Sequence, residues 1–372
     1  MIISALKSTD PKDKRSPIHP DTISSLLGLK SEVWFEKMIA NNINIADEIF
    51  VELGVKKFSR EECLKNGDLI ITNQPLLENE LKIVKSGATI LGTVNPFNNQ
   101  SFINLCSELN INLVSMEFIP RITRAQKMDV LSSQANLAGY VAVIESTRYI
   151  NSALPMMMTA AGTLKPARVF VIGVGVAGLQ AIATAKRLGA RVEAFDTREA
   201  VEEQVNSLGA KFVKIDLGET GETEQGYAKE LTKEQINKQK ELQAKVCERS
   251  DIVITTAQLF GKPAPKIIDN TIIDGMAPGS VIFDMAVESG GNVEGSRVDE
   301  VVERNGVKII GMSNISSHVG NHASFALSNN YNNWIKDFYD QETNKINFNF
   351  DDEIINSSVL VFNRKIRNER FS

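Results

Sequence analysis

Residues 168–187 read RVFVIGVGVAGLQAIATAKR, and this stretch decides the fold. The run at 168–172 is typical of a buried strand, and the residues after the last glycine are good helix formers. Between the two lie Gly173, Gly175 and Gly178 in the spacing GxGxxG, which allows a tight turn and the approach of a pyrophosphate to a helix N-terminus. A strand, this turn and a helix, in that order, predict a dinucleotide-binding unit.

An acidic residue closes the next expected strand. Asp196 follows the run RVEAF at 191–195, about twenty residues beyond the glycines, where a carboxylate accepts hydrogen bonds from the adenosine ribose. The same charge repels a 2′-phosphate, so the pattern favours NAD(H). Two alternatives stay open: Arg198 favours NADP(H), or the glycines only pack and Asp196 is a surface residue.

The alternation of strand and helix continues on both sides of this unit. Further strands are expected in the same domain at 211–215, 251–255, 280–284 and 307–311, and earlier in the chain at 48–52 (EIFVE), 68–72, 88–92 and 111–115. This rhythm predicts an α/β protein with two Rossmann-like, doubly wound parallel-sheet domains that face a cleft.

Long helical patterns mark the expected domain boundaries. A helix over 129–149 leads into the second domain, and the run SFALSNNYNNWIKDFY (324–339) predicts a helix that returns to the first. We therefore expect a first domain of residues 1–128 plus about 325–372, and an NAD(H)-binding domain of residues 129–324. A loop over 217–228 and a charged helix over 229–249 are expected within the second domain, and PMMM (155–158) is expected to fill its core.

Composition excludes several classes of protein. The net charge of −5 shows no basic excess, which argues against nucleic acid as a partner. The 3 cysteines have no CxxC or Cys/His spacing, so we expect no metal site, no disulfide framework and a reducing, cytoplasmic compartment. No apolar run approaches the ~18 residues of a membrane span, so direct membrane insertion is not expected.

A polar group precedes the long helix. The stretch PRITRAQKMDVLSSQANLAGY (120–140) contains Arg121, Gln126, Asp129 and Ser132, which suit the carboxamide and ribose of a nicotinamide. The alternative is that Asp129 caps the helix while the other side chains face water.

A catalytic acid–base pair is not evident from the sequence. The 3 histidines have no evident acidic or thiol partner. A dehydrogenase acting on an alcohol or an amino acid normally needs a general acid or base, whereas transfer between two nicotinamide rings needs only their alignment at ~3–3.5 Å.

From roughly residue 85 to 312 the chain resembles the alanine dehydrogenase/transhydrogenase family, and within it the NAD(H)-binding components of proton-translocating NAD(P) transhydrogenases. The resemblance is strongest over 120–140 and 155–190. It implies that NAD(H) binds here and that hydride passes to NADP(H) on a partner subunit, while a membrane-spanning subunit moves protons. It also implies a homodimer that is peripheral to the inner or plasma membrane through those partners.

The same resemblance assigns roles to residues. Gln126 would reach toward the partner's nicotinamide, while Arg121, Asp129 and Ser132 would position the ring of NADH. The residues expected at the cofactor are Gly173, Gly175, Val176, Ala177, Gly178, Asp196, Thr197, Arg198, Tyr227, Thr256, Ala257 and Lys262. From the residues alone, Tyr227 also suits a surface position, and Lys262 a rigid structural loop.

The chain departs from its family in places. Alanine dehydrogenases carry a substrate lysine and a catalytic histidine where this chain has ITNQPLLENE (71–80) and GTVNPFNN (92–99), so pyruvate chemistry is disfavoured. The segments 11–29 and 314–330 also follow the family pattern loosely. An amino-acid or hydroxy-acid dehydrogenase, and a non-catalytic NAD-binding regulatory subunit, remain the alternatives.

Overall fold

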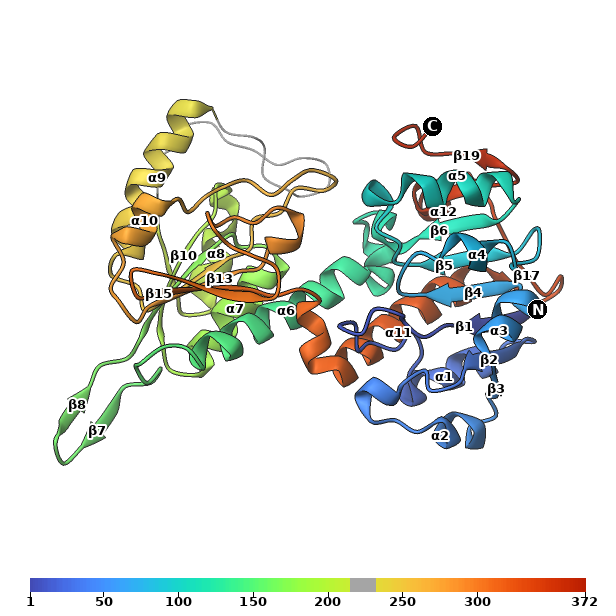
Figure 1. Ribbon diagram of the computed structural model, residues 1–372, viewed down its shortest axis with the longest axis horizontal. Coiled ribbons are helices and arrows are strands. Elements are labelled where there is room, and N and C mark those ends of the chain that lie inside the picture. Colours follow the sequence, from blue (N-terminus) through green and yellow to red (C-terminus); the bar gives the residue numbers. More distant parts are fainter. Residues whose placement is uncertain (215–231) are drawn as a thin grey trace. The chain divides into compact units, whose positions relative to one another are not determined.

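The computed structural model describes residues 1–214 and 232–372, which form two compact units (Figure 1). The first unit comprises Met1–Gln134 and Ser317–Ser372, and the second comprises Ala135–Ser316. Helix α6 (Val130–Thr147) contains the boundary between them. Within the described part of the chain, no helix is both long and apolar enough to cross a bilayer.

The first unit is built on an 8-stranded sheet of order β19-β18-β6-β5-β4-β1-β2-β3. Strands β1 to β6 are parallel and follow the doubly wound order, whereas β18 and β19 are antiparallel. The strands are β1 Ile2–Ala5, β2 Glu32–Glu36, β3 Lys56–Phe58, β4 Leu69–Thr72, β5 Thr89–Gly92, β6 Asn112–Ser115, β18 Val359–Phe362 and β19 Lys365–Ile366; a separate pair is β16 Tyr339–Asp340 and β17 Lys345–Ile346.

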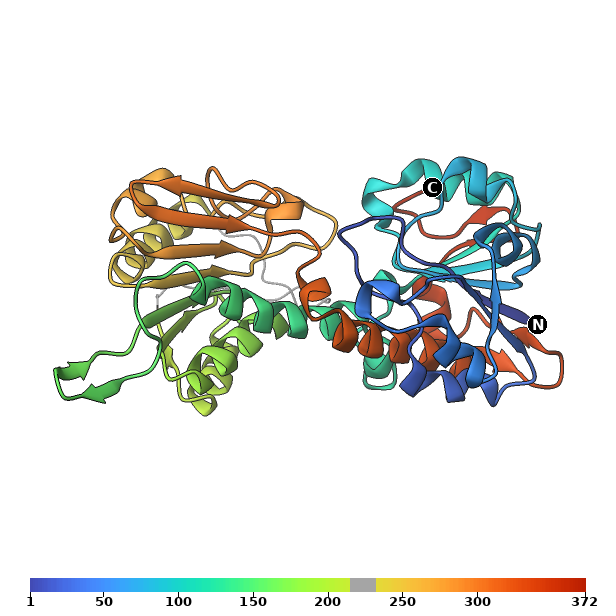
Figure 2. The same ribbon diagram turned by 60° about the horizontal axis from the view of Figure 1, so that its bottom comes forward.

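Helices cover both faces of this sheet (Figure 2). Because side chains alternate along a strand, Ile3 and Ala5 of β1 share a core with α1 and α11, while Ser4 bonds the carbonyl oxygen of Cys63 in α3. The helices of this unit are α1 Pro20–Leu27, α2 Asp47–Glu52, α3 Arg60–Asn66, α4 Glu78–Leu81, α5 Gln100–Glu108, α11 Gly320–Phe338 and α12 Glu353–Ser358.

The strand predicted at 48–52 is wrong, because this segment is helix α2. Alternation would bury Ile49 and Val51, yet both are exposed and Phe50 alone is buried. Asp47 and Glu48 lie in the first turn, where acidic side chains stabilise the positive end of a helix. The other strands predicted in this unit, at 68–72, 88–92 and 111–115, are confirmed as β4, β5 and β6.

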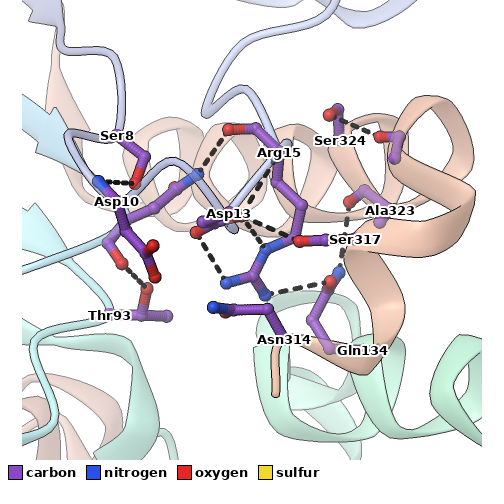
Figure 3. Close-up of polar contacts among 12 residues, drawn as sticks. Ser8, Asp10, Asp13, Arg15, Thr93, Gln134, Asn314, Ser317, Ala323 and Ser324 are labelled. Atoms are coloured by element: carbon purple, nitrogen blue, oxygen red, sulfur yellow. Dashed lines mark hydrogen bonds and ion pairs between the residues drawn. The ribbon is translucent and has the colours of Figure 1, made fainter. Parts of the chain in front are cut away.

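The helix predicted over 324–339 is confirmed as α11, and a ring of polar contacts joins its start to the N-terminal loop (Figure 3). The Arg15 guanidinium holds both oxygens of Asp13 at 2.8 and 2.9 Å, and the Ser317 hydroxyl donates to Asp13 at 3.0 Å. On the other side, Arg15 donates to the Gln134 amide oxygen at 3.3 Å, and Gln134 donates to the carbonyl of Ala323 at 3.1 Å. The loosely matching segments at 11–29 and 314–330 are thus bonded to each other.

The second unit is built on a 7-stranded sheet of order β11-β10-β9-β12-β13-β15-β14, in which only β14 is antiparallel among the described strands. Its strands are β9 Arg168–Ile172, β10 Arg191–Phe195, β11 Lys211–Phe212, β12 Ile252–Thr255, β13 Val281–Asp284, β14 Glu300–Arg304 and β15 Val307–Gly311. Its helices beyond α6 are α7 Val176–Arg187, α8 Glu202–Ser207, α9 Lys233–Cys247 and α10 Asn270–Asp274. The predicted strands are therefore confirmed, although the strand expected at 211–215 ends at Phe212.

The expectation that PMMM (155–158) fills the core is wrong. Part of it forms the hairpin of β7 (Met157–Thr159) and β8 (Gly162–Leu164), which extends away from the sheet of the second unit (Figure 1). Met156 and Met158 are 59% and 83% exposed. Methionine is common at adaptable binding surfaces as well as in cores, and this run belongs to the first kind.

The cysteines should be chemically inert in the folded chain. Cys63, Cys106 and Cys247 are free and buried, and burial raises the pKa of each thiol to about 12. Because only the thiolate reacts, we expect no modification by a soluble disulfide reagent at pH 8. The same assay in denaturant should titrate all 3 thiols. Rapid reaction of the native chain would show that the burial is incomplete.

Candidate functional site

The turn from β9 into α7 needs its three glycines for three different reasons. Gly173 has φ +97°, and a Cβ there would lie 2.4 Å from the Thr256 hydroxyl. A Cβ on Gly178 would lie 1.9 Å from the carbonyl oxygen of Gly173, so this glycine lets the helix pack against the strand end. A Cβ on Gly175 would meet nothing within 4 Å. The described residues therefore do not require glycine at position 175, and a group approaching from outside would.

Helix α7 begins beside this open position. Gly175 is its N-cap, and no side chain accepts a hydrogen bond at the cap. Val176 is 40% exposed and Ala177 is half-buried. The first N–H groups of a helix carry partial positive charge, so an uncapped start next to an open glycine can receive an anion such as a pyrophosphate.

This turn lies at the topological switch point of the sheet. After β9 the chain builds β10 and β11 on one side, then crosses to form β12 on the other side of β9. Thr256 follows β12, and its hydroxyl donates to the carbonyl of Gly173 at 3.0 Å, which joins the two loops. Ligands of doubly wound folds bind at such a point, outside the carboxyl ends of the strands.

Asp196 lies at the end of β10 and is 9% exposed. One carboxylate oxygen accepts the backbone N–H of Val174 at 2.7 Å, which ties the glycine turn to β10. The backbone N–H and the guanidinium of Arg198 occupy further lone pairs, each at 2.9 Å. Thr197, between them, is half-buried. The backbone contact of Val174 is one that reasoning from the sequence missed.

Two further residues shape the loop after β12. The side-chain amide of Asn292 donates to the carbonyls of Ala257 and Pro265 at 2.8 and 2.9 Å. Asp284, fully buried at the end of β13, accepts the backbone N–H groups of Ala286 and Asn292 at 3.0 and 3.1 Å. Neither residue was predicted as part of the site, although an aspartate at a strand end followed by GGN is the signal that marks them.

Lys262 lies in a turn of the same loop, where its backbone N–H bonds the carbonyl of Leu259 at 3.2 Å, and its side chain is exposed. Tyr227 lies outside the described residues. Among the residues that the structure describes, no three histidine, cysteine, aspartate or glutamate side chains gather as a metal site would require.

The predicted nicotinamide group belongs to the first unit. Asp129 precedes α6 and binds both the backbone N–H and the hydroxyl of Ser132, at 2.9 and 2.6 Å. This is the geometry of an N-cap, the simpler of the two interpretations of Asp129. Arg121 and Gln126 are exposed, and Gln126 lies on the short helix Thr123–Met128.

The carboxyl edge of the first sheet is occupied by amides that bond the chain itself. Gln74 accepts from the Ser8 hydroxyl and from the backbone N–H of Thr9, at 2.8 and 3.0 Å. Asn73 donates to the carbonyl of Arg15 at 3.2 Å. Both residues lie in the stretch 71–80, where a dehydrogenase of this family would carry its substrate lysine, and their side chains hold the N-terminal loop.

One acidic group at this edge was not predicted. Burial raises the pKa of Glu117, which follows β6. Its two oxygens accept the backbone N–H of Asn95 and the hydroxyl of Ser115, both at 2.7 Å. This carboxyl joins two strand ends and is braced on both oxygens.

Known proteins resemble this chain over nearly its whole length. Residues 6–138 match the family model described as "Alanine dehydrogenase/PNT, N-terminal domain", and residues 142–369 match "Alanine dehydrogenase/PNT, C-terminal domain". An NAD(P) transhydrogenase subunit alpha chain from Rickettsia prowazekii is 42% identical, over 99% of this chain and 96% of the relative.

Two further matches agree with these. The protein of the same name from Rhodospirillum rubrum is 42% identical over 97% of this chain and 96% of its own length. The crystal structure of a transhydrogenase from Sinorhizobium meliloti superposes with a TM-score of 0.89 at 37% identity, and covers 98% of this chain and 100% of that one.

Proposed function

Since the chain belongs to the alanine dehydrogenase/PNT family, we propose that it is the NAD(H)-binding component of an NAD(P) transhydrogenase. It passes hydride from NADH to NADP⁺ held by a partner subunit. A membrane-spanning subunit couples the transfer to proton movement, and this chain works in the cytoplasm at the surface of the membrane. The similarity to transhydrogenase alpha subunits from end to end carries this proposal.

The second unit fits a dinucleotide in the proposed role. The space above Gly175 and the uncapped start of α7 suit the pyrophosphate, and Asp196 stands where the adenosine ribose would bind. Thr256 holds the turn that receives the pyrophosphate. The cofactor supplies the hydride; the chain binds and orients it. Tyr227, outside the described residues, stays part of the proposed site.

Arg121, Gln126, Asp129 and Ser132 are proposed to position the nicotinamide. The bond between Asp129 and Ser132 supports a fixed orientation of these two side chains, which favours a defined ring position over a mobile one. The exposed side chain of Gln126 supports its proposed reach toward the nicotinamide of the partner.

An amino-acid dehydrogenase is the alternative within the family. It needs a substrate-binding cation and a general acid or base in the first unit. Asn73 and Gln74 instead bond the N-terminal loop, and the Arg15 charge is paired with Asp13, which disfavours this alternative. A non-catalytic NAD-binding subunit is the other alternative, and the presence of Arg121, Gln126 and Asp129 disfavours it.

The deciding experiment measures transfer with and without a partner. The purified chain, NADH and thio-NADP⁺ are mixed, and the reduced thio-nucleotide is followed by absorbance. We expect turnover only after an NADP(H)-binding transhydrogenase component is added. No transfer with several competent partners would contradict the proposal, and turnover of an amino acid or hydroxy acid by the chain alone would favour the dehydrogenase.

The variant Gln126→Asn separates alignment from binding. Shortening this exposed side chain leaves the nucleotide site of the second unit unchanged, so the Kd for NADH should stay within about twofold of the unmodified chain. The partner-dependent transfer rate should fall at least about tenfold, because hydride transfer depends steeply on geometry. Single-turnover kinetics and fluorescence titration give the two values, and a parallel loss of both would contradict the assigned role.

The proposed homodimer needs an apolar surface, and the β7–β8 hairpin offers one. Met156, Met158 and Leu164 are 59%, 83% and 46% exposed, and such groups are normally covered by a partner. We expect the double variant Met156→Ser/Met158→Ser to shift the chain toward monomer in sedimentation velocity. Leu53→Ser, which removes a side chain 44% exposed in the first unit, is the control and should leave the mass unchanged. A monomeric parent chain would contradict the dimer.

A further inference from the structure

The carboxylate proposed to bind the adenosine ribose is already saturated with donors from this chain. A carboxylate has about four lone-pair positions. Those of Asp196 are taken by the N–H of Val174 at 2.7 Å, and by the backbone N, Nε and Nη2 of Arg198, each at 2.9 Å. Two of the four donors are backbone groups fixed by the fold, and the other two belong to one side chain.

The two side-chain bonds are the ones that a ribose would need. The 2′- and 3′-hydroxyls of an adenosine ribose are two adjacent donors that require two acceptor positions on one carboxylate. The backbone N–H groups of Val174 and Arg198 cannot leave without breaking the turns that hold β9 and β10. The Arg198 guanidinium, at the end of a rotatable side chain, is the replaceable donor.

The guanidinium is held firmly enough to compete with a ligand. Its side chain is 14% exposed and that of Asp196 is 7% exposed, so the pair is largely shielded from water. The Nη2 group also contacts the carbonyl of Val174 at 3.3 Å, on the glycine turn itself. Planar, bidentate pairing of arginine with a carboxylate is stronger than a single surface ion pair.

We propose that the Arg198 side chain occupies the ribose position on Asp196 and must be displaced when NADH binds, which makes it a specificity-determining residue. For NADH the displacement is a cost, since the guanidinium loses its partner. For NADPH the displaced guanidinium meets the 2′-phosphate, a dianion that it can pair bidentately. Arg198 therefore narrows the preference for NADH that Asp196 alone would give. The inference rests on the proposed function, because it takes Asp196 as the ribose ligand.

The variant Arg198→Met tests this role, because it keeps the aliphatic stem and removes the donors. Fluorescence titration of the full chain should show NADH binding about three- to tenfold tighter, the range expected for releasing a partly shielded ion pair. NADPH should bind more weakly, so the ratio of the two Kd values rises by more than tenfold. Arg187→Met, at the exposed C-terminal end of α7, removes the same charge and should change neither value.

A second pair of ligands limits the test to the ribose. Adenosine 5′-monophosphate and adenosine 2′,5′-bisphosphate differ only in the 2′-phosphate, and Arg198→Met should favour the first and disfavour the second. Equal weakening of NADH and NADPH would show that Arg198 contacts a part common to both, and would overturn the inference. An unchanged Kd ratio in a variant of normal thermal stability would also overturn it. If the unmodified chain binds neither nucleotide, the proposed function itself fails.

Discussion

Replacing Gly178 by alanine is expected to destabilise the second unit and to abolish NADH binding. The added Cβ would lie 1.9 Å from the carbonyl oxygen of Gly173, and a backbone atom cannot rotate away as a side chain can. Helix α7 must therefore move off the end of β9. Overpacking of this kind costs about 3 kcal/mol, which corresponds to a fall in Tm of roughly 6–12 °C for a domain of this size. Differential scanning calorimetry and NADH titration give the two values.

The matched control lies three positions earlier. A Cβ on Gly175 meets no atom within 4 Å, and the φ of this residue, −83°, is open to alanine. Gly175→Ala should keep the Tm of the unmodified chain, and NADH should bind at least about tenfold more weakly because the methyl group fills the space where the pyrophosphate approaches. Normal stability of Gly178→Ala would contradict the close packing, and normal binding by Gly175→Ala would place the pyrophosphate elsewhere.

The same physics explains which parts of the fold the sequence predicts. Strands buried in a parallel sheet read as continuous apolar runs, so 168–172 and 307–311 coincide with β9 and β15 to the residue. The segment EIFVE has the composition of such a run, but its acidic first turn and the single burial of Phe50 make it a helix. Composition alone does not separate the two when an apolar run is five residues long.

The failures of prediction are those where a residue's partner is distant in the sequence. The methionines at 156–158 are apolar and look like core until the sheet is built without them. Likewise, Arg15 and Ser317 meet on Asp13 although about three hundred residues separate their positions, and no local pattern indicates this. Arg198 is two residues from Asp196, so its presence could be predicted, whereas its direct pairing with the carboxylate needed the structure.

Replacing Asp196 by alanine is expected to reverse the nucleotide preference. The variant loses the acceptor for both ribose hydroxyls, and hydrogen bonds to a charged group are worth about 1.5–3 kcal/mol each, so NADH should bind roughly 100-fold more weakly. The guanidinium of Arg198 loses its partner at the same time and becomes available to a 2′-phosphate. The affinity for NADPH should therefore fall far less than that for NADH, or rise. Calorimetric titration of both nucleotides in one buffer at fixed salt measures the difference.

Asp251→Ala is the control that isolates this effect from lost stability. Asp251 accepts the backbone N–H of Arg168 at 2.7 Å, the same distance that joins Asp196 to Val174, but it does so at the amino end of β9. Both variants remove one negative charge and one bond to the backbone of the same sheet, so both should lower the Tm by a similar amount. Only Asp196→Ala should change the ratio of the Kd values. If the two nucleotides weaken equally in Asp196→Ala, the carboxylate serves the turn rather than the ribose, and the preference for NADH must come from another residue.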